Sequence, residues 1–139
     1  MRKILHIGLL LVTTLFFSAC SILPQKTDAE IVEKRSTLRL EALKKLEFEK
    51  AYKYMSPGYR SIKTLERFKL DYAGVVNLLD FKIESAKCEE DTCNVTVIGD
   101  YKVSIVARGF SATKPLIVER ASQETWIRTD GQWWFLKND

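Results

Sequence analysis

Histidine is almost absent from this chain of 139 residues, whose one histidine is His6. Histidine is the commonest general base, so a serine-centred hydrolase would lack its usual partner here. The sequence also contains no phosphate-binding loop, dinucleotide fingerprint or nucleophile-elbow motif. These absences argue against the main hydrolase and nucleotide-dependent enzyme classes, and we expect no cofactor.

The sequence also lacks an apolar run long enough to cross a bilayer. Residues 4–17 are mostly apolar, but they include His6 and fall short of the roughly 20 residues that a membrane-spanning helix needs. Arg2 and Lys3 precede this run, and two small residues follow it. This arrangement is typical of an export signal, and we assign it to residues 1–19.

The end of that signal, "FSAC" at residues 17–20, resembles the lipobox of bacterial lipoproteins, although Phe17 replaces the usual leucine. The resemblance implies that the Cys20 thiol receives a diacylglyceryl group, that cleavage precedes Cys20, and that acyl chains such as palmitate anchor the protein. Residues 20–26 would then form a lipidated tether. Ser21 follows the cysteine, which by Gram-negative sorting rules favours the outer membrane, with the domain facing the periplasm. The alternatives are an uncleaved anchor or an ordinary signal peptide that ends in cysteine.

Cleavage would change the composition of the working chain. His6 leaves, and the formal net charge falls from +4 to +2 because Arg2 and Lys3 are lost from the 22 basic residues. Such a weak charge gives no nucleic-acid footprint, so no nucleic-acid partner is expected. The remaining residues 27–139 have the length of a single domain.

Two cysteines remain after lipidation, Cys88 and Cys93. An even pair in an exported chain favours a disulfide, which would close a short loop. A metal site is the alternative, and the lack of histidine in the mature chain makes it a poor one. If the two cysteines faced each other directly, the apolar faces of the flanking strands would point opposite ways. We therefore predict a bridge beyond the regular ladder, or a bulge within it.

Helical patterns fill the first half of the domain. Thr27 and Glu30 fit a capping box, and the helix that follows is expected to bury Ile31, Leu38, Ala42 and Leu46. A second stripe comprises Phe48, Ala51, Tyr52 and Met55, and residues 56–58 read as its stop. A third helix is expected over residues 65–72, with Thr64 as its N-cap.

Strand patterns fill the second half. Leu79, Phe81 and Ile83 alternate with polar residues, and a longer alternation follows Cys93. Residues 116–129 and 132–136 flank a two-residue turn at Asp130-Gly131. Pairing about this turn sets Trp126 opposite Phe135, Ile127 opposite Trp134 and Glu124 opposite Lys137.

Residues 48–61, "FEKAYKYMSPGYRS", followed by residues 124–136, "ETWIRTDGQWWFL", resemble the nuclear-transport-factor-two-like superfamily, also called cystatin-like or ketosteroid-isomerase-like. The closer resemblance is to small bacterial lipoproteins with that fold. It implies an α+β fold in which N-terminal helices pack in a strongly curved, cone-shaped antiparallel sheet around a cleft. Relatives often have Gly-Asp before the aromatic residue, where this chain has Leu46-Glu47, so the sequence leaves open a break between the first two helices.

The resemblance implies several functions, because members are isomerases, dehydratases or binding proteins, and many dimerise through the sheet. The candidate cleft or binding-surface residues are Tyr52, Glu124, Trp126, Trp133, Trp134 and Phe135. Tyr52 could be an oxyanion donor or a core tyrosine, and Glu124 could be a cleft acid or an ion-pair partner of Lys137.

The function expected from these observations is a non-catalytic binding or interaction module in the cell envelope. It would be anchored through Cys20 and would hold an envelope protein or a small ligand. A cleft enzyme and a purely structural homodimer are the alternatives. No catalytic residue and no metal ligand is assigned.

Overall fold

Helices precede strands in the computed structural model, which describes residues 26–72, 77–103, 106–107, 110–111 and 115–137. Four strands form an open antiparallel sheet in the order β1-β2-β5-β6. The predicted α+β class is confirmed. The predicted signal peptide, Cys20 and the tether up to residue 25 lie outside the described residues.

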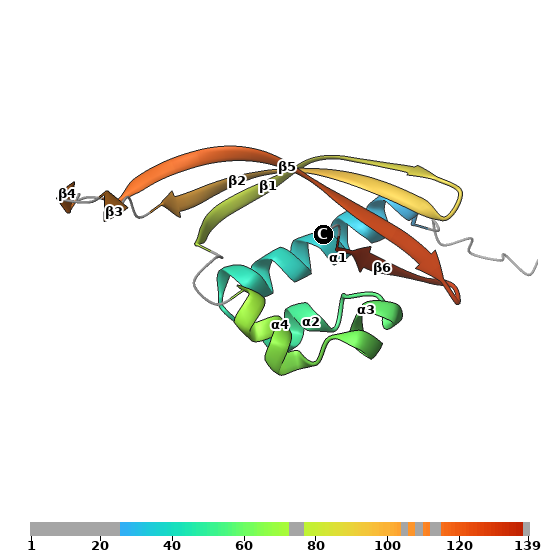
Figure 1. The fold of residues 1–139 in the computed structure, drawn as a ribbon. Helices are drawn as coiled ribbons and strands as arrows, with labels where there is room; N and C mark the ends of the chain where they lie inside the picture. The colour runs from blue at the N-terminus through green and yellow to red at the C-terminus, as the bar shows by residue number, and fades with distance from the viewer. Residues whose placement is uncertain (1–25, 73–76, 104–105, 108–109, 112–114, 138–139) are drawn as a thin grey trace, which may run out of the picture.

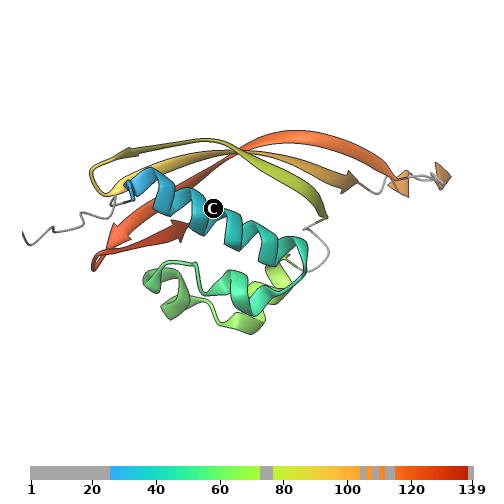
Figure 2. The same cartoon turned by 180° about the vertical axis from the view of Figure 1, so that it is seen from behind.

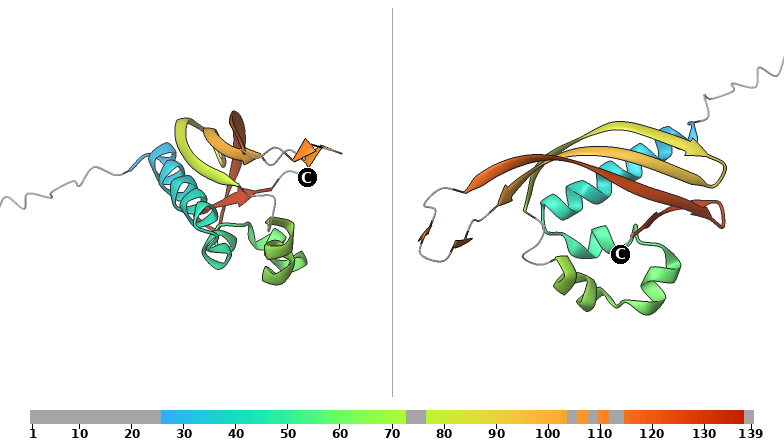
Figure 3. Two further views of the ribbon diagram at one scale, coloured as in Figure 1. Left: turned by 90° about the vertical axis from the view of Figure 1, so that its left-hand side faces the viewer. Right: turned by 45° about the horizontal axis from the view of Figure 1, so that its top comes forward.

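The helices lie on one side of the sheet. The long helix α1 (Asp28–Lys44) runs beneath the strands, and the short helices α2 (Phe48–Tyr52), α3 (Pro57–Ile62) and α4 (Leu65–Tyr72) lie below it (Figure 1). The right-hand view of Figure 3 shows that α1 crosses the strands diagonally. The predicted capping box is present, since the Thr27 hydroxyl accepts from Glu30 N and the Glu30 carboxylate accepts from Thr27 N.

The buried face of α1 differs from the expected one. Leu38 and Leu46 were expected to face inward, but they are 46% and 60% exposed. Ala42 is buried as expected. The buried residues of α1 also include two polar ones, and they are Val32, Ser36, Arg39, Leu40, Ala42 and Leu43. Apolar periodicity missed part of this set because Ser36 and Arg39 occupy two of its positions.

The break between α1 and α2, which the sequence left open, lies at Leu46. Its φ of 58° is left-handed, a conformation that ends a helix. The Glu47 amide then donates to the Ala42 carbonyl at 2.8 Å. The two helices are therefore separate.

Residues 56–58 were expected to stop a helix, but they also start one. The Ser56 hydroxyl accepts from the Tyr59 amide at 3.2 Å, and Pro57 is the first residue of α3. Proline suits this position because the first amides of a helix need no intrahelical partner. The α4 prediction is confirmed, with the Thr64 hydroxyl accepting from the Arg67 amide at 3.3 Å.

The long strands of the sheet arch over α1, and two of them run past the helices (Figures 1 and 2). The strands of the main sheet are β1 (Leu78–Glu89), β2 (Thr92–Val103), β5 (Leu116–Thr129) and β6 (Gln132–Leu136). At the projecting end of β2 and β5 lies a separate two-stranded pair, β3 (Val106–Ala107) and β4 (Phe110–Ser111).

The disulfide and a register shift occur together, as the strand patterns predicted. Cys88 lies directly opposite Cys93 and is bonded to it. The register shifts between Ile83 and Ser85, so that Phe81 and Ile83 before the shift and Ala86 and Cys88 after it all pack against the core. Without this irregularity one half of β1 would turn its apolar side chains to solvent. Leu79 was expected on the buried face but is 41% exposed, because a second shift follows Leu78, which is buried instead.

The β5–β6 hairpin has the predicted ends and register. Asp130 and Gly131 have φ values of 53° and 72°, so both central residues of the turn are left-handed. This geometry is that of a type I′ turn, which favours Asp-Gly. Trp126 pairs with Phe135 and Ile127 with Trp134, as expected.

Candidate functional site

Glu124 lies at the centre of a buried polar cluster between α1 and β5. Its side chain belongs to a residue only 6% exposed, and the Arg39 Nη1 group donates to its Oε1 atom at 2.7 Å. The Ser36 hydroxyl and the Trp126 indole N–H both donate to Oε2, at 2.7 and 2.9 Å. Both carboxylate oxygens are therefore engaged by donors.

Helix and strand geometry bring these groups together. Ser36 and Arg39 are three residues apart and share one face of α1, while Glu124 and Trp126 share the inner face of β5. The Arg39 guanidinium also lies 3.6 Å from the centroid of the Phe135 ring. The cluster joins the long helix to the sheet through a charged hydrogen-bond network.

The predicted ion pair between Glu124 and Lys137 is wrong. The Glu124 carboxylate bonds to Arg39, and the Lys137 ammonium instead lies 5.4 Å from the centroid of the Tyr72 ring. Cross-strand pairing about the turn suggested Lys137, but no sequence pattern indicated that a helix would place an arginine closer.

Tyr52, the other candidate for cleft chemistry, has different partners. Its hydroxyl donates to the Lys63 carbonyl at 2.6 Å and lies 3.3 Å from the Arg60 carbonyl. Its ring packs edge-on against Phe68 at 5.3 Å between centroids. Tyr52 thus stabilises the connection between α3 and α4, and its hydroxyl shares no hydrogen-bond partner with Glu124 among the described residues.

The tryptophans divide between core and surface. Trp126, Trp133 and Phe135 are buried, and the Trp133 indole N–H donates to Asp28 Oδ1 at 3.2 Å. Trp134 faces the other way and is half-buried. Of the aromatic candidates on β5 and β6, Trp134 is the one that can meet a ligand.

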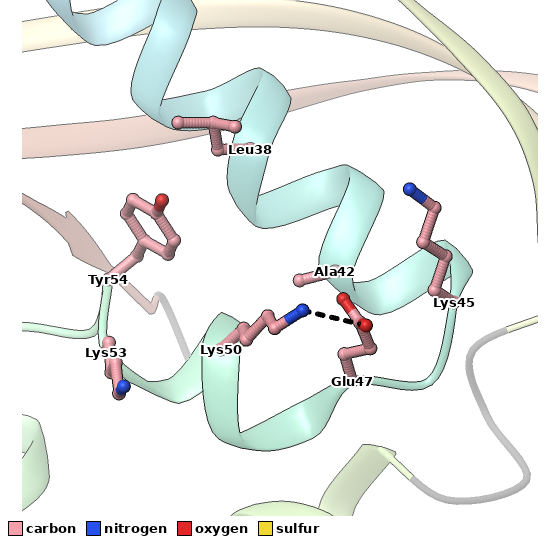
Figure 4. Close-up of a pocket in the computed structure, with 7 residues that line it drawn as sticks. All are labelled: Leu38, Ala42, Lys45, Glu47, Lys50, Lys53 and Tyr54. Atoms are coloured by element: carbon pink, nitrogen blue, oxygen red, sulfur yellow. Dashed lines mark hydrogen bonds and ion pairs between the residues drawn. The ribbon is translucent and has the colours of Figure 1, made fainter.

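A pocket of about 350 Å³ opens between α1 and α2 (Figure 4). Leu38 and Ala42 give it an apolar side, and Tyr54 forms another wall. The lysines at its rim outnumber the acid: Lys45, Lys50 and Lys53 against Glu47. Lys50 and Glu47 pair at 2.8 Å, so the net charge of the rim is positive. Sequence reasoning missed this site because it treated Leu38 as core.

The outer edge of β5 is open over most of its length. β2 pairs with β5 from Leu116 to Ile127, but β6 pairs only with residues 125–129. No other described strand pairs with residues 116–124. Leu116, Ile117 and Val118 within this open edge are 50%, 61% and 38% exposed.

In the described part of the chain, no group of three or more metal-ligating side chains lies together. No helix among the described residues is long and apolar enough to cross a membrane.

Comparison with known proteins shows the fold and nothing more. No protein-family model matches the sequence, and no curated protein matches it. Among solved structures, a SEC-C motif containing protein from Rhodopseudomonas palustris has a TM-score of 0.54 at 14% identity, over 78% of this chain and 76% of that one.

Two further solved structures are similar at comparable identity. A SEC-C motif containing protein from Psychrobacter arcticus has a TM-score of 0.53 at 12% identity, over 81% of this chain but only 61% of that one. A candidate dehydratase of the NTF2-like family from Streptomyces avermitilis has a TM-score of 0.47 at 15% identity, over 76% and 89%. The likeness to the two SEC-C motif proteins supports a shared α+β fold.

Proposed function

We propose that this chain is a lipoprotein of the outer membrane whose nuclear-transport-factor-two-like domain binds another envelope protein and performs no chemistry. The lipobox-like residues 17–20 support the anchor at Cys20. The motifs at residues 48–61 and 124–136 support the family and its cone-shaped arrangement. The engagement of both Glu124 oxygens supports a structural role for that acid.

The open edge of β5 is the observation that carries the binding role. The Arg128 amide donates to the Asp91 carbonyl at 2.8 Å, on the β2 side of the strand. Backbone groups alternate in direction along an antiparallel strand. The amides and carbonyls of Ile117, Glu119, Ala121 and Gln123 therefore point away from β2, towards the open edge.

The other edge of the sheet provides a comparison. β1 has two register shifts against β2, and such irregularities discourage pairing with a further strand. The β2–β5 register has none over its whole length. An unprotected edge with exposed apolar side chains is the geometry that accepts an added strand.

The occupant we propose is an extended segment of a different protein. Two copies of β5 pairing antiparallel about the middle of the open edge would set Arg120 opposite Arg120, which is unfavourable. A foreign strand can place an acidic residue opposite Arg120 and apolar residues opposite Leu116 and Val118. Charge complementarity thus favours a partner protein over a homodimer through this edge.

Substituting Ala121→Pro tests this role, because it removes an outward amide and leaves the inward ladder with β2 intact. The readout is an adduct formed in cells by a photo-crosslinking residue at Gln123, with Lys87 on β1 as the control position. We expect one defined adduct at Gln123 that is lost with Ala121→Pro and kept with Ala121→Thr.

Two results would overturn the proposal. An adduct of the same size in the Ala121→Pro variant would show that the edge amides do not hold the partner. A delipidated domain that forms a stable dimer, with an adduct of two copies of this chain, would favour the structural homodimer instead.

A further inference from the structure

Two arginines of the helical layer have no acid to pair with among the described residues. Arg35 lies on α1 and Arg60 on α3, and neither forms an ion pair there. Both guanidinium carbons lie beside the Trp134 ring of β6, at 5.5 and 5.0 Å from its centroid. The Nε atoms of both arginines are buried and have no hydrogen-bond partner.

Other partly buried arginines of this fold are paired with carboxylates. Arg39 bonds to Glu124 at 2.7 Å, and Arg128 bonds to Asp91 at 2.7 Å and to Asp28 at 3.1 Å. Burying a guanidinium donor without an acceptor costs free energy, so such groups are normally satisfied. The Nε atom of Arg39 also lacks a partner, but its guanidinium has the Glu124 carboxylate, whereas Arg35 and Arg60 have no carboxylate among the described residues.

Tyr54 restricts the position of Arg35. Its ring centroid lies 5.1 Å from the Arg35 guanidinium, so that Arg35 contacts two aromatic rings. Burial lowers the pKa of Arg35, and Tyr54 only partly offsets this effect. The guanidinium stays protonated at neutral pH, and its charge is incompletely compensated by the π faces of the rings.

We propose that Arg35 and Arg60 form an oxyanion-binding site beside Trp134, which takes the carboxylate of an organic acid. The fork of N–H donors on each guanidinium fits a carboxylate, and two guanidiniums around one indole would hold it from two elements. This site is separate from the β5 edge, and the inference does not rest on the function proposed for that edge.

The neighbouring pocket indicates the rest of the ligand. Tyr54 contacts Arg35 and also lines the pocket between α1 and α2. Leu38 and Ala42 give that pocket an apolar side. An acid held by Arg35 can therefore extend an apolar tail past Tyr54 onto Leu38, so the ligand class is a carboxylate with an apolar body.

The site is tested by titrating the mature chain, residues 20–139, with each of three probes. The probes are hexanoate, acetate and inorganic phosphate. Tryptophan fluorescence and the amide shifts of Trp134 and Arg35 report binding. We expect hexanoate to saturate, with acetate at least tenfold weaker for lack of a tail. Arg35→Gln and Arg60→Gln should each weaken hexanoate at least tenfold, while Arg67→Gln, an exposed arginine paired with Asp71, should not.

Each alternative outcome counts against the inference. Equal affinity in Arg35→Gln, Arg60→Gln and Arg67→Gln would show non-specific binding to positive charge. Tight binding of phosphate without hexanoate would refute the carboxylate class. Absence of saturation by all three probes would refute the site. Arg35→Lys and Arg60→Lys keep the charge, so they replace the glutamine variants if those fail to fold. They should still weaken hexanoate binding, because lysine cannot bind a carboxylate in the bidentate way.

Discussion

Glu124 and Arg39 are charged groups held out of water, with side chains 7% and 5% exposed. Removing two charges from solvent costs several kcal/mol, and the pair recovers this cost only with good geometry and further hydrogen bonds. Ser36 and Trp126 supply those bonds at the second carboxylate oxygen. The cluster is therefore sensitive to the loss of any one charge.

Glu124→Gln should destabilise the fold by about 3 kcal/mol, because it leaves the Arg39 charge buried and unpaired. Urea unfolding followed by tryptophan fluorescence measures the loss. Glu119→Gln is the matched control, since Glu119 is exposed on the same strand, and it should change stability by less than about 0.5 kcal/mol. Equal stability of the two variants would show that the buried charges contribute nothing to stability.

Lys44 and Asp80 pair at 2.9 Å where the end of α1 meets β1. The hydrogen bond from Lys44 holds the pKa of Asp80 below its ordinary value, with help from the Phe81 amide. A lowered carboxyl pKa stabilises the fold above the ordinary pKa, and the effect is lost as pH falls through the lowered value. The pair lies at the solvent-exposed surface, so it changes the pKa of Asp80 but contributes little to the free energy of unfolding.

Lys44→Gln should therefore raise the pKa of Asp80 towards its ordinary value. Titration of the side-chain carboxyl by NMR measures this shift, and Glu49 in the same spectrum is a control outside the pair. Any stability difference between wild type and variant should appear near pH 7 and vanish in acid. An unchanged Asp80 titration would mean that Lys44 does not reach the carboxylate in solution.

At the scale of elements, the hairpin from Leu116 to Leu136 was predictable and the buried face of α1 was not. The Asp130-Gly131 turn fixes register locally, so pairs such as Trp126 with Phe135 follow from counting. The buried face of α1 depends on hydrogen bonds from Ser36 and Arg39 to Glu124, which is 88 and 85 residues away in the sequence. A local sequence pattern does not reveal a partner so far along the chain.

The register shift beside the disulfide belongs to the same scale, because predicting it depended on comparing two strand patterns. Their apolar faces conflicted unless the ladder was interrupted, and the register shift next to Ile83 resolves the conflict. Trp134 was a candidate from the aromatic residues of the hairpin, but no local pattern indicated that Arg35 and Arg60 would lie beside it. The β5 edge had no sequence signal, because its openness depends on β6 pairing only with residues 125–129 among the described strands.

Replacing both Cys88 and Cys93 by serine should lower the free energy of unfolding by about 2 kcal/mol, the loop-closure entropy of a short bridge. Urea unfolding with and without reductant measures it, and reductant should have no effect on the double variant. Asn94→Ala, a neighbouring exposed position, is the control for local disturbance. If reductant leaves the wild type unchanged, the bridge does not stabilise the protein.

At the scale of the whole molecule, the start of α1 and the open edge of β5 lie towards opposite ends. Asp28 at the start of α1 pairs with Arg128, next to the β5–β6 turn. The other end of β5, at Leu116, projects past the helices (Figure 1). A tether of residues 20–26 spans about 20 Å when extended. Anchoring at Cys20 would thus hold the turn end near the bilayer and direct the open edge outward.

The anchor itself is tested by Cys20→Ser. Thiol acylation needs cysteine, and two or more acyl chains are what make membrane attachment stable. The wild-type chain should begin at residue 20 with an acylated amino terminus, seen by mass spectrometry, and should incorporate labelled palmitate. Cys20→Ser should lose the label and retain residues 1–19. The Cys88→Ser, Cys93→Ser double variant should keep the label, which separates lipidation from general loss of thiols. A mature chain that starts elsewhere, or a label that survives Cys20→Ser, would refute the lipid anchor at Cys20. Without that anchor, nothing would direct the open edge of β5 away from the membrane.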